Sequence, residues 1–563
     1  VFQKSVNKLE FYYQFSIHLS QAGLLKEAVS FFQQLPKPKL EAEIKNEAGV
    51  TCDLIWDLFN ASDLGNLDRE ISADLTISQS QAYQYFSEFK PYQVLVSSKL
   101  TEPEKLVIEN LGISLEYLQL MTVEDNELEN IYVNNFEGNA EIIKKRTTIV
   151  TKKKDSYYPP VDFPQTIVEF KYFYTVCPLS GRVVRSNQSF YIPGSSAIVY
   201  RFLGKEVFYV VAGGFTGEKA SVYLPKFNLF IYLPNTRFVN SWVKDDVIYL
   251  FQSYVVSNWK YVEDYLVSTA DRPVATILAC YSNLGHYFWQ DITGVYYLLE
   301  NNLLEKVDCF CVGKHEYLEL SSIFPEIPER KIVKTSKMSA EEQFRWFLEN
   351  NYVCLRITDN FIKQNLAETI YQTARSLCSK DFLKSVENAK ENSGLLLWIN
   401  IRTHNKSWVS QVKGYSLIVN KLREEFPKLS IGVIIDGTPD AASCAEEIMG
   451  KLKPEVKVYN TLGCPLVESI VWAHYIDAYV ATVGSGLVMT SWLSDKPGVA
   501  HGDRAHLNQQ VFWSDMKENS IPPVFVKSKH IISQYHRMYG NYQLNWRVIY
   551  NYLVEILHSS SFI

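Results

Sequence analysis

A histidine and an aspartate follow one short apolar run of the sequence, in a pattern that could serve proton transfer. His286 and Asp291 come after the run Val274–Tyr281, and Asn283 can cap a helix that begins there. Histidine titrates near neutral pH, so His286 could take a proton from a sugar hydroxyl as a general base. Helical geometry does not guarantee that Asp291 faces His286. The alternative is a histidine that only forms hydrogen bonds inside a domain core.

A basic turn follows a second apolar run, Leu395–Ile401. Arg402 and Lys406 are spaced so that both cations could converge on one diphosphate, and His404 lies between them. Arginine offers a bidentate fork of donors, whereas lysine offers a point charge. A solvated basic turn without a ligand is the alternative interpretation.

A glycine turn follows a third apolar run, Ala478–Val483. Gly484, Ser485 and Gly486 separate this run from the helical pattern Leu487–Leu493. Small residues let a ligand approach the backbone, and the N–H groups at a helix start favour an anion such as a phosphate. The same pattern also occurs in tight turns that bind nothing.

Four further residues are candidates for the same ligand site. A carboxylate before or within a helix at this distance could accept the hydroxyl groups of a ribose. Glu468 could equally be a surface residue of its helix. The four candidates are Asp436, Gly437, Glu468 and His501.

The elements that must position these residues alternate between strand and helix. This alternation predicts two α/β units with parallel sheets, joined near Pro328–Ser336, and ligands bind at the carboxyl ends of such strands. The first unit begins with the strand Val274–Tyr281. The strands predicted for the second unit are Val353–Ile357, Leu395–Ile401, Ile431–Asp436, Val456–Tyr459 and Ala478–Val483.

A β-rich segment and a helical segment precede the α/β units. Alternating runs from Thr166 onward, among them TIVEFKYFYTV and VIYLF, predict a meander of strands. Before them, Phe11–Pro36 resembles one tetratricopeptide helix-turn-helix, with Gly23, Ala28 and Pro36 at the expected places. We expect residues 1–122 to be helical and to offer a surface for a protein partner.

Composition narrows the possible functions. A net charge of −6 over 563 residues gives no reason to expect a nucleic-acid partner. Nine scattered cysteines without a CxxC pair favour reduced thiols and a cytoplasmic location. No apolar run approaches 18 residues, so no transmembrane segment is expected. Asp-x-Asp, GxxxxGK[ST], HExxH and GxSxG are absent, which leaves metal-dependent sugar transferases, P-loop enzymes, zincins and α/β-hydrolases without a motif.

At these residues the chain resembles the GT-B glycosyltransferases, and among them glycosyltransferase family 61. The resemblance covers about Thr166 to Leu557 and rests on the order of four features: the β-rich lead-in, His286 with Asp291, the Arg402 turn and the Gly484 turn. Where that family commonly has a His-Gly-Ala-Gly turn, this chain has Val483-Gly484-Ser485-Gly486. A role for that histidine therefore does not carry over.

The resemblance implies a bacterial, metal-independent enzyme that needs no cofactor and moves a sugar from a nucleotide-sugar donor to a glycan or protein acceptor. His286 would be the base, with Asp291 as its orienting or substitute carboxylate. Arg402, Lys406 and the Gly484 turn would stabilise the leaving diphosphate. The implied domains are 1–122 (helical, tetratricopeptide-like), 123–334 (β-rich, then α/β, on the acceptor side) and 335–563 (α/β, nucleotide-sugar-binding).

Two rival functions remain. One is another nucleotide-sugar chemistry on the same architecture, such as an epimerase or a sugar-phosphate transferase. The other is a non-catalytic scaffold, in which a degenerate transferase domain supports binding by the helical segment.

Overall fold

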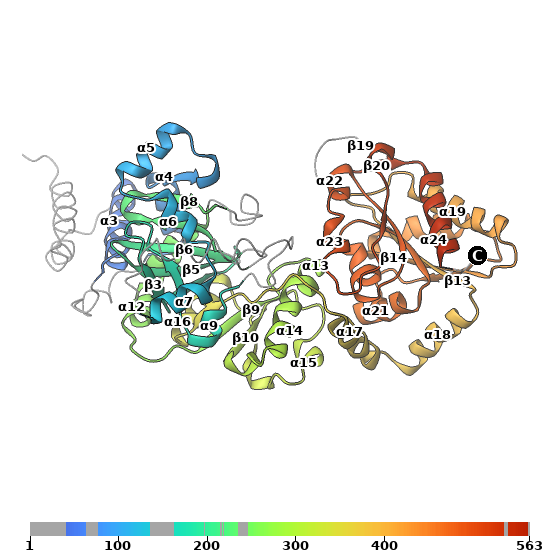
Figure 1. The fold of residues 1–563 in the computed structure, drawn as a ribbon, viewed down its shortest axis with the longest axis horizontal. Coiled ribbons are helices and arrows are strands. Elements are labelled where there is room, and N and C mark those ends of the chain that lie inside the picture. The colour runs from blue at the N-terminus through green and yellow to red at the C-terminus, as the bar shows by residue number, and fades with distance from the viewer. Residues whose placement is uncertain are drawn as a thin grey trace, which may run out of the picture. The chain divides into compact units, whose positions relative to one another are not determined.

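The computed structural model describes residues 41–62, 77–134, 163–195, 197–213, 217, 219–234, 246–533 and 539–560. The chain forms two compact units (Figure 1). Unit 1 contains Val1–Cys280, Tyr297–Lys314 and Arg330–Asp359, and unit 2 contains Tyr281–Tyr296, His315–Glu329 and Asn360–Ile563. The predicted tetratricopeptide-like pair, Phe11–Pro36, lies outside the described residues.

Unit 1 begins with a mostly antiparallel sheet in the order β1-β8-β7-β6-β5-β4. Strands β4 to β8 pair with their neighbours in the chain, as a meander does, whereas β1 pairs in parallel with β8. The strands are β1 (Gln93–Val96), β4 (Ser189–Ile192), β5 (Ala197–Leu203), β6 (Val207–Gly213), β7 (Lys219–Leu224) and β8 (Leu229–Tyr232). The predicted meander is therefore present over these runs.

Aromatic side chains join this sheet to its helices. The ring of Trp56 lies 5.9 Å from that of Tyr209 and 5.7 Å from that of Phe251. Each such pair adds about 0.5–1.5 kcal/mol beyond the apolar area that it buries. The helices that contribute to this core are α3 (Glu41–Phe59), α4 (Gln79–Phe89), α11 (Val247–Ser257), α12 (Trp259–Val267) and α16 (Ala340–Glu349).

Two predicted strands of the meander are wrong, at least in part. VIYLF lies in helix α11, where eight of eleven residues are buried on all sides, so no helical stripe reveals the period. The run TIVEFKYFYTV is divided: Thr166 lies in helix α9 (Gln165–Phe170), Lys171 has a left-handed φ of 64°, and only then does strand β2 (Phe173–Val176) begin.

Further short elements of unit 1 lie within its first 190 residues. The expected helix Glu104–Met121 is two helices, because Gly112 turns the chain with φ 74° between them. They are α5 (Glu102–Asn110) and α6 (Leu115–Leu120), followed by α7 (Asp125–Val133), and β3 (Val183–Ser186) pairs with β2.

A parallel sheet of four strands completes unit 1, in the order β11-β10-β9-β12. These are β9 (Val274–Leu278), β10 (Cys309–Val312), β11 (Ile332–Lys334) and β12 (Val353–Leu355). The expectation that Val353–Ile357 starts the second sheet is wrong, because β12 pairs in parallel with β9. Numbered from β9, the order is 3-2-1-4, which is the start of a Rossmann-type sheet.

Unit 2 contains a parallel sheet in the order β15-β14-β13-β16-β17-β18. Its strands are β13 (Leu395–Ile401), β14 (Ile431–Gly437), β15 (Lys457–Asn460), β16 (Ala478–Thr482), β17 (Gly498–His501) and β18 (Val524–Phe525). Numbered from β13, this is the 3-2-1-4-5-6 order of the doubly wound dinucleotide-binding fold. The predicted fold class, two Rossmann-type sheets after a β-rich and a helical segment, is confirmed.

Helices and short turns connect these strands. They are α15 (Leu320–Ile323), α17 (Gln364–Leu377), α18 (Lys380–Glu391), α19 (Gln411–Glu425), α20 (Ala442–Met449), α21 (Leu466–Tyr475), α22 (Arg504–Leu507), α23 (Val511–Ser514) and α24 (Trp546–Ser559). Strands β19 (Ile531–Ser533) and β20 (Tyr542–Leu544) form a separate pair. No helix in the described parts of the chain has the length and apolarity needed to span a membrane.

Candidate functional site

The strand order of unit 2 brings the basic turn and the glycine turn together. β13 and β16 are neighbours in the sheet, although β14 and β15 lie between them in the chain. Connections leave these two strands in opposite directions, so a crevice opens at their carboxyl ends, where α/β sheets bind ligands. Arg402 to Lys406 follow β13, and Gly484 to Gly486 follow β16.

Lys406 lies against the glycine turn. Its side chain is buried, and its Nζ donates a hydrogen bond to the carbonyl oxygen of Val483 at 3.2 Å. Burial, then the nearby charge of Arg402, lowers the pKa of Lys406 to about 8. A Cβ atom at Gly484, where φ is 121°, would lie 2.5 Å from Nζ. Glycine is therefore required here for the backbone conformation and for the approach of the ammonium group.

Arg402 is half-buried and held within the turn. Its Nε donates to the carbonyl oxygen of Asn405 at 3.2 Å, and one terminal nitrogen donates to Asn405 Oδ1 at 3.1 Å. The amide group of Gln411 binds both the N–H and the carbonyl oxygen of Arg402. His404 is exposed, and its Nε2 lies 3.2 Å from a carboxylate oxygen of Asp440. The turn thus directs Arg402 and Lys406 toward each other's field and pairs His404 with Asp440.

Asn400 and Asp436 lie beside the second glycine of the turn. A Cβ atom at Gly486 would lie 2.7 Å from Asn400 Oδ1, and Asn400 Nδ2 donates to Asp436 Oδ2 at 2.8 Å. Among the described residues, Asn400 Oδ1 is buried without a hydrogen-bond partner. Burial raises the pKa of Asp436 to about 6, although the hydrogen bond from Asn400 opposes the shift. Gly437 packs tightly, since a Cβ there would lie 2.7 Å from the carbonyl oxygen of Ile401.

His501 lies in the interior of unit 2. Its Nε2 is 3.0 Å from the hydroxyl of Tyr415, and its Nδ1 is 2.5 Å from the hydroxyl of Tyr542. Burial lowers the pKa of His501 to about 3, so the ring is neutral. The structure therefore gives His501 two tyrosine partners and does not bring it into the turn.

Asp503 contributes a charge that sequence reasoning did not assign to the site. Its carboxylate caps α22 and accepts a hydrogen bond from His506 Nδ1 at 2.7 Å. Burial opposes ionisation, but the hydrogen bonds from His506 lower the pKa of Asp503 overall. The Asp503 charge in turn favours the charged form of Lys406. The spacing of Asp503 and His506 by three residues was the available signal.

Glu468 lies half-buried in the first turn of α21. Burial, then the charge of Glu468, raises the pKa of Cys378 to about 11. Glu468 is therefore near Cys378, and no hydrogen bond or ion pair within the described part of the chain joins it to the Gly484 turn.

His286 stands at the start of an irregular helix in unit 2. Asn283 caps helix α13 (Leu284–His286), which continues as the π-helix η3 (Tyr287–Ile292) and then α14 (Thr293–Glu300). His286 Nδ1 lies 2.9 Å from Gln290 Oε1, and Gln290 Nε2 donates to Asn360 Oδ1 at 3.2 Å. Gln290 is a partner that sequence reasoning missed, although its spacing of four residues places it on the same helical face.

Asp291 is buried within η3, with 2% of its surface exposed. The pKa of Tyr287 is raised by burial, then by the charges of Glu316 and Asp291, so Asp291 lies near Tyr287. The structure thus places the carboxylate beside Tyr287 and gives the imidazole of His286 an amide partner.

The helix that carries His286 packs against the helix that follows the glycine turn. The latter is the π-helix η8 (Val488–Leu493), and its Trp492 ring lies 5.7 Å from that of Trp289. A Cβ atom at Gly285 would lie 3.6 Å from Val488 Cγ2. π-Helical turns often occur at functional sites. The predicted base and the predicted phosphate turn are therefore carried on contacting helices of one unit.

Within the described residues, no group of three or more His, Cys, Asp and Glu side chains is arranged to hold a metal ion. No family model and no curated protein matches the chain. Several solved structures are similar to part of it. ADP-heptose lipopolysaccharide heptosyltransferase II from E. coli is 13% identical, covers 51% of this chain and 99% of its own, and has a TM-score of 0.34.

Two further similar structures have lower scores. The glycosyl transferase family 9 protein from Veillonella parvula is 11% identical over 53% of this chain and 78% of its own, with a TM-score of 0.25. A mutant of S. aureus TarM, solved in complex with UDP and other ligands, is 9% identical over 87% of this chain and 92% of its own, with a TM-score of 0.23. At such scores the likeness carries no argument, and the fold rests on the strand orders above.

Proposed function

We propose that the chain is a glycosyltransferase that moves a sugar from a nucleotide-sugar donor to a glycan or protein acceptor. The observation that carries this proposal is the position of Lys406 against Gly484, at the crevice between β13 and β16. A buried ammonium group whose pKa is lowered by burial gains a favourable environment when an anion binds.

The diphosphate of the donor binds to Lys406, Arg402 and the backbone at the Gly484 turn. When the bond from the anomeric carbon to the phosphate oxygen breaks, the electron pair leaves with the diphosphate. Cations placed in advance stabilise this developing charge without reorganising. They take the role that a divalent ion has in metal-dependent transferases, so the proposed reaction needs no metal and no cofactor.

Asn400 and Asp436 supply hydrogen-bond acceptors for hydroxyl groups of the donor. Asn400 Oδ1 is buried and lacks a partner among the described residues, and a ligand hydroxyl would satisfy it. Gly484 and Gly486 both leave space for the ligand because neither carries a Cβ. Gly437 supports the site through strand packing, and Ser485 contributes its position in the turn.

His286 is the proposed base for the acceptor hydroxyl. When Nδ1 carries its proton toward Gln290 Oε1, the lone pair of the imidazole lies on Nε2. That nitrogen takes the proton while the acceptor oxygen forms its bond to the anomeric carbon. Asp291 is a positioning residue of the same helix. The helical segment 1–122 remains the proposed surface for a protein partner, and a bacterial, cytoplasmic enzyme is part of the same proposal.

The test is the thermal shift of the purified chain with UDP, ADP, GDP and their common nucleotide sugars, with and without EDTA. A ligand that binds only the native state raises Tm. We expect one nucleoside diphosphate to raise Tm regardless of EDTA. Lys406→Met should remove the shift, whereas Lys413→Met, at an exposed position of α19, should keep it.

Other outcomes would identify the rival functions. No shift with any nucleotide would favour the scaffold. A shift accompanied by interconversion of the nucleotide sugar, with no transfer to water or acceptor, would favour an epimerase.

A further inference from the structure

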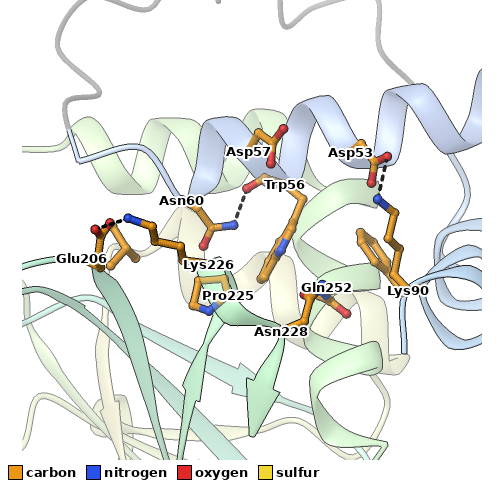
Figure 2. A pocket seen from close by; sticks show the side chains of 12 residues that line it. Asp53, Trp56, Asp57, Asn60, Lys90, Glu206, Pro225, Lys226, Asn228 and Gln252 are labelled. Carbon is orange, nitrogen blue, oxygen red and sulfur yellow. Dashed lines mark hydrogen bonds and ion pairs between the residues drawn. The ribbon is translucent and has the colours of Figure 1, made fainter. Parts of the chain in front are cut away.

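A second pocket lies in unit 1, far along the chain from the residues of the donor site (Figure 2). Its volume is about 250 Å³, below the roughly 300–1,000 Å³ typical of sites for drug-sized ligands. Helices α3, α4 and α11, the start of β6 and the turn before β8 contribute its walls. The residues on which the argument depends are Asp53, Trp56, Asn60, Lys90, Lys226 and Gln252.

The charged groups around this pocket are largely paired with one another. Lys90 Nζ lies 3.1 Å from Asp53, and Lys226 forms an ion pair with Glu206. With Asp57, three carboxylates face two ammonium groups, so the formal charge of the lining is −1. Such a lining opposes a phosphate or another anion, because both cations already have carboxylate partners. The pocket therefore suits a neutral ligand.

An amide oxygen of the lining lacks a hydrogen bond. Gln252 is 2% exposed, and its Nε2 donates a long hydrogen bond of 3.5 Å to the hydroxyl of Tyr223. Its Oε1 is buried with no partner within the described part of the chain. A buried acceptor left unpaired costs free energy, which a donating ligand hydroxyl would recover.

Trp56 supplies the aromatic surface of the pocket, and Figure 2 shows its ring below helix α3 between Lys226 and Gln252. The ring is fixed by its neighbours Tyr209 and Phe251, at 5.9 and 5.7 Å. Next to it, Asn60 is held by a hydrogen bond from Asn60 Nδ2 to the Trp56 carbonyl oxygen at 2.6 Å. A rigid indole beside amides and paired charges is suited to a sugar ring, which has apolar C–H faces and a rim of hydroxyl groups.

We propose that this pocket binds one neutral sugar residue, with a hydroxyl donating to Gln252 Oε1 and the ring lying against Trp56. The site is separate from the donor site in chain and in residues. The proposal does not rest on transferase activity, since binding alone would satisfy it.

The test is saturation-transfer-difference NMR of the full chain with glucose, galactose and N-acetylglucosamine, each at millimolar concentration. We expect a signal from at least one sugar. Gln252→Leu should weaken binding about tenfold, the effect of losing one hydrogen bond in a desolvated site. The same variant should raise Tm, since leucine removes the unpaired oxygen, so a loss of binding could not be attributed to unfolding.

Matched variants complete the test. Gln84→Leu makes the same change at an exposed position of α4 outside the pocket and should bind as the wild type does. Lys406→Met should also leave the signal intact, which separates this site from the donor site. Absence of signal with all three sugars would overturn the proposal. So would an unchanged affinity in Gln252→Leu, or competition of the sugar by inorganic phosphate.

Discussion

The two parallel sheets share the strand order 3-2-1-4, yet their carboxyl edges differ in the atoms that meet the turns. In unit 1, β9 ends at Ala279, whose φ is 57°, and a Cβ at Gly313 after β10 would lie 2.7 Å from the Ala279 carbonyl oxygen. The carbonyl oxygen of Arg356, after β12, lies 2.9 Å from the Cβ position of Gly217. Backbone therefore packs against backbone at this edge.

In unit 2, a side chain meets the turn after the fourth strand. β16 leads directly into the Gly484 turn, and the atom nearest to the Cβ position of Gly484 is Lys406 Nζ. The comparison shows that strand order creates a suitable edge, but the residues after the first and fourth strands decide whether it can bind an anion. It also shows that β9 contributes differently, since the segment that follows it, with His286, belongs to unit 2.

The largest effect should come from His286→Gln, which removes the base carried by that segment. Turnover should fall by about 10²–10⁴-fold, since glutamine cannot take the proton. The KM for the donor should stay near that of the wild type. His558→Gln, at an exposed position of α24, serves as the control in the same transferase assay. Wild-type turnover in His286→Gln would restrict the chemistry to the two turns of the second sheet.

Gly484→Ala should make the edge of the second sheet resemble the tightly packed edge of the first. The alanine would hold a φ of 121°, which costs about 1–3 kcal/mol in unfolding free energy, and would displace the Lys406 ammonium group. We expect nucleoside diphosphate affinity, measured by calorimetry, to fall about a hundredfold. Gly450→Ala, with φ −64° at the end of α20, should leave affinity unchanged. Equal effects of both variants would contradict a specific role for Gly484.

Lys406→Met should weaken diphosphate binding by about 10- to 100-fold, the value of one charge-assisted hydrogen bond. Lys314→Met, at the exposed edge of the first sheet, should have no effect on affinity. The folded pKa of Lys406, about 8, lies below its usual 10.5. The unfolded chain therefore binds more protons between these values, and stability rises as pH increases from 8 to 10.5.

The same variant should thus be more stable than the wild type at pH 7. Below pH 8 the full penalty is present, up to about 3 kcal/mol for a shift of this size. Denaturant unfolding at pH 7 and pH 10 would measure it, and Lys406→Met should lose the rise between them. A variant that is less stable at pH 7 would show that Lys406 is a structural cation instead.

Asp436→Asn should have the smallest effect on binding, about threefold, because asparagine retains an acceptor oxygen but not its charge. The folded pKa of Asp436, about 6, lies above its usual 3.8. Stability should therefore fall as pH rises from about 4 to 6, by up to about 3 kcal/mol. Unfolding curves across this window should be flatter for Asp436→Asn. An equally steep fall in the variant would assign the pH dependence to other carboxylates.

Much of the second sheet could be predicted from the sequence, because β13, β14 and β16 are continuous apolar runs followed by polar or glycine residues. The contact of Lys406 with Gly484 could not, since it depends on β13 lying next to β16, which residue patterns do not encode. The π-helices were also beyond prediction: the sequences of η3 and η8 are compatible with ordinary helices. Helix α11 was mistaken for a strand because it is apolar on every face.

His501 shows a different limit. Its position after β17 made it a candidate for the ligand site, but two tyrosines from distant parts of the chain, Tyr415 and Tyr542, enclose it. Residue type and spacing indicate where a side chain can reach. They do not show which neighbours from other elements occupy its nitrogens.

The division of the chain into units has a consequence for its inheritance. The polypeptide changes unit at 280/281, 296/297, 314/315, 329/330 and 359/360, so it crosses between them five times. The segment with His286 is therefore encoded inside the stretch that specifies unit 1. A recombination event with a single breakpoint cannot exchange either unit whole, and we expect relatives of this chain to vary by substitution and loop length within units more readily than by shuffling them.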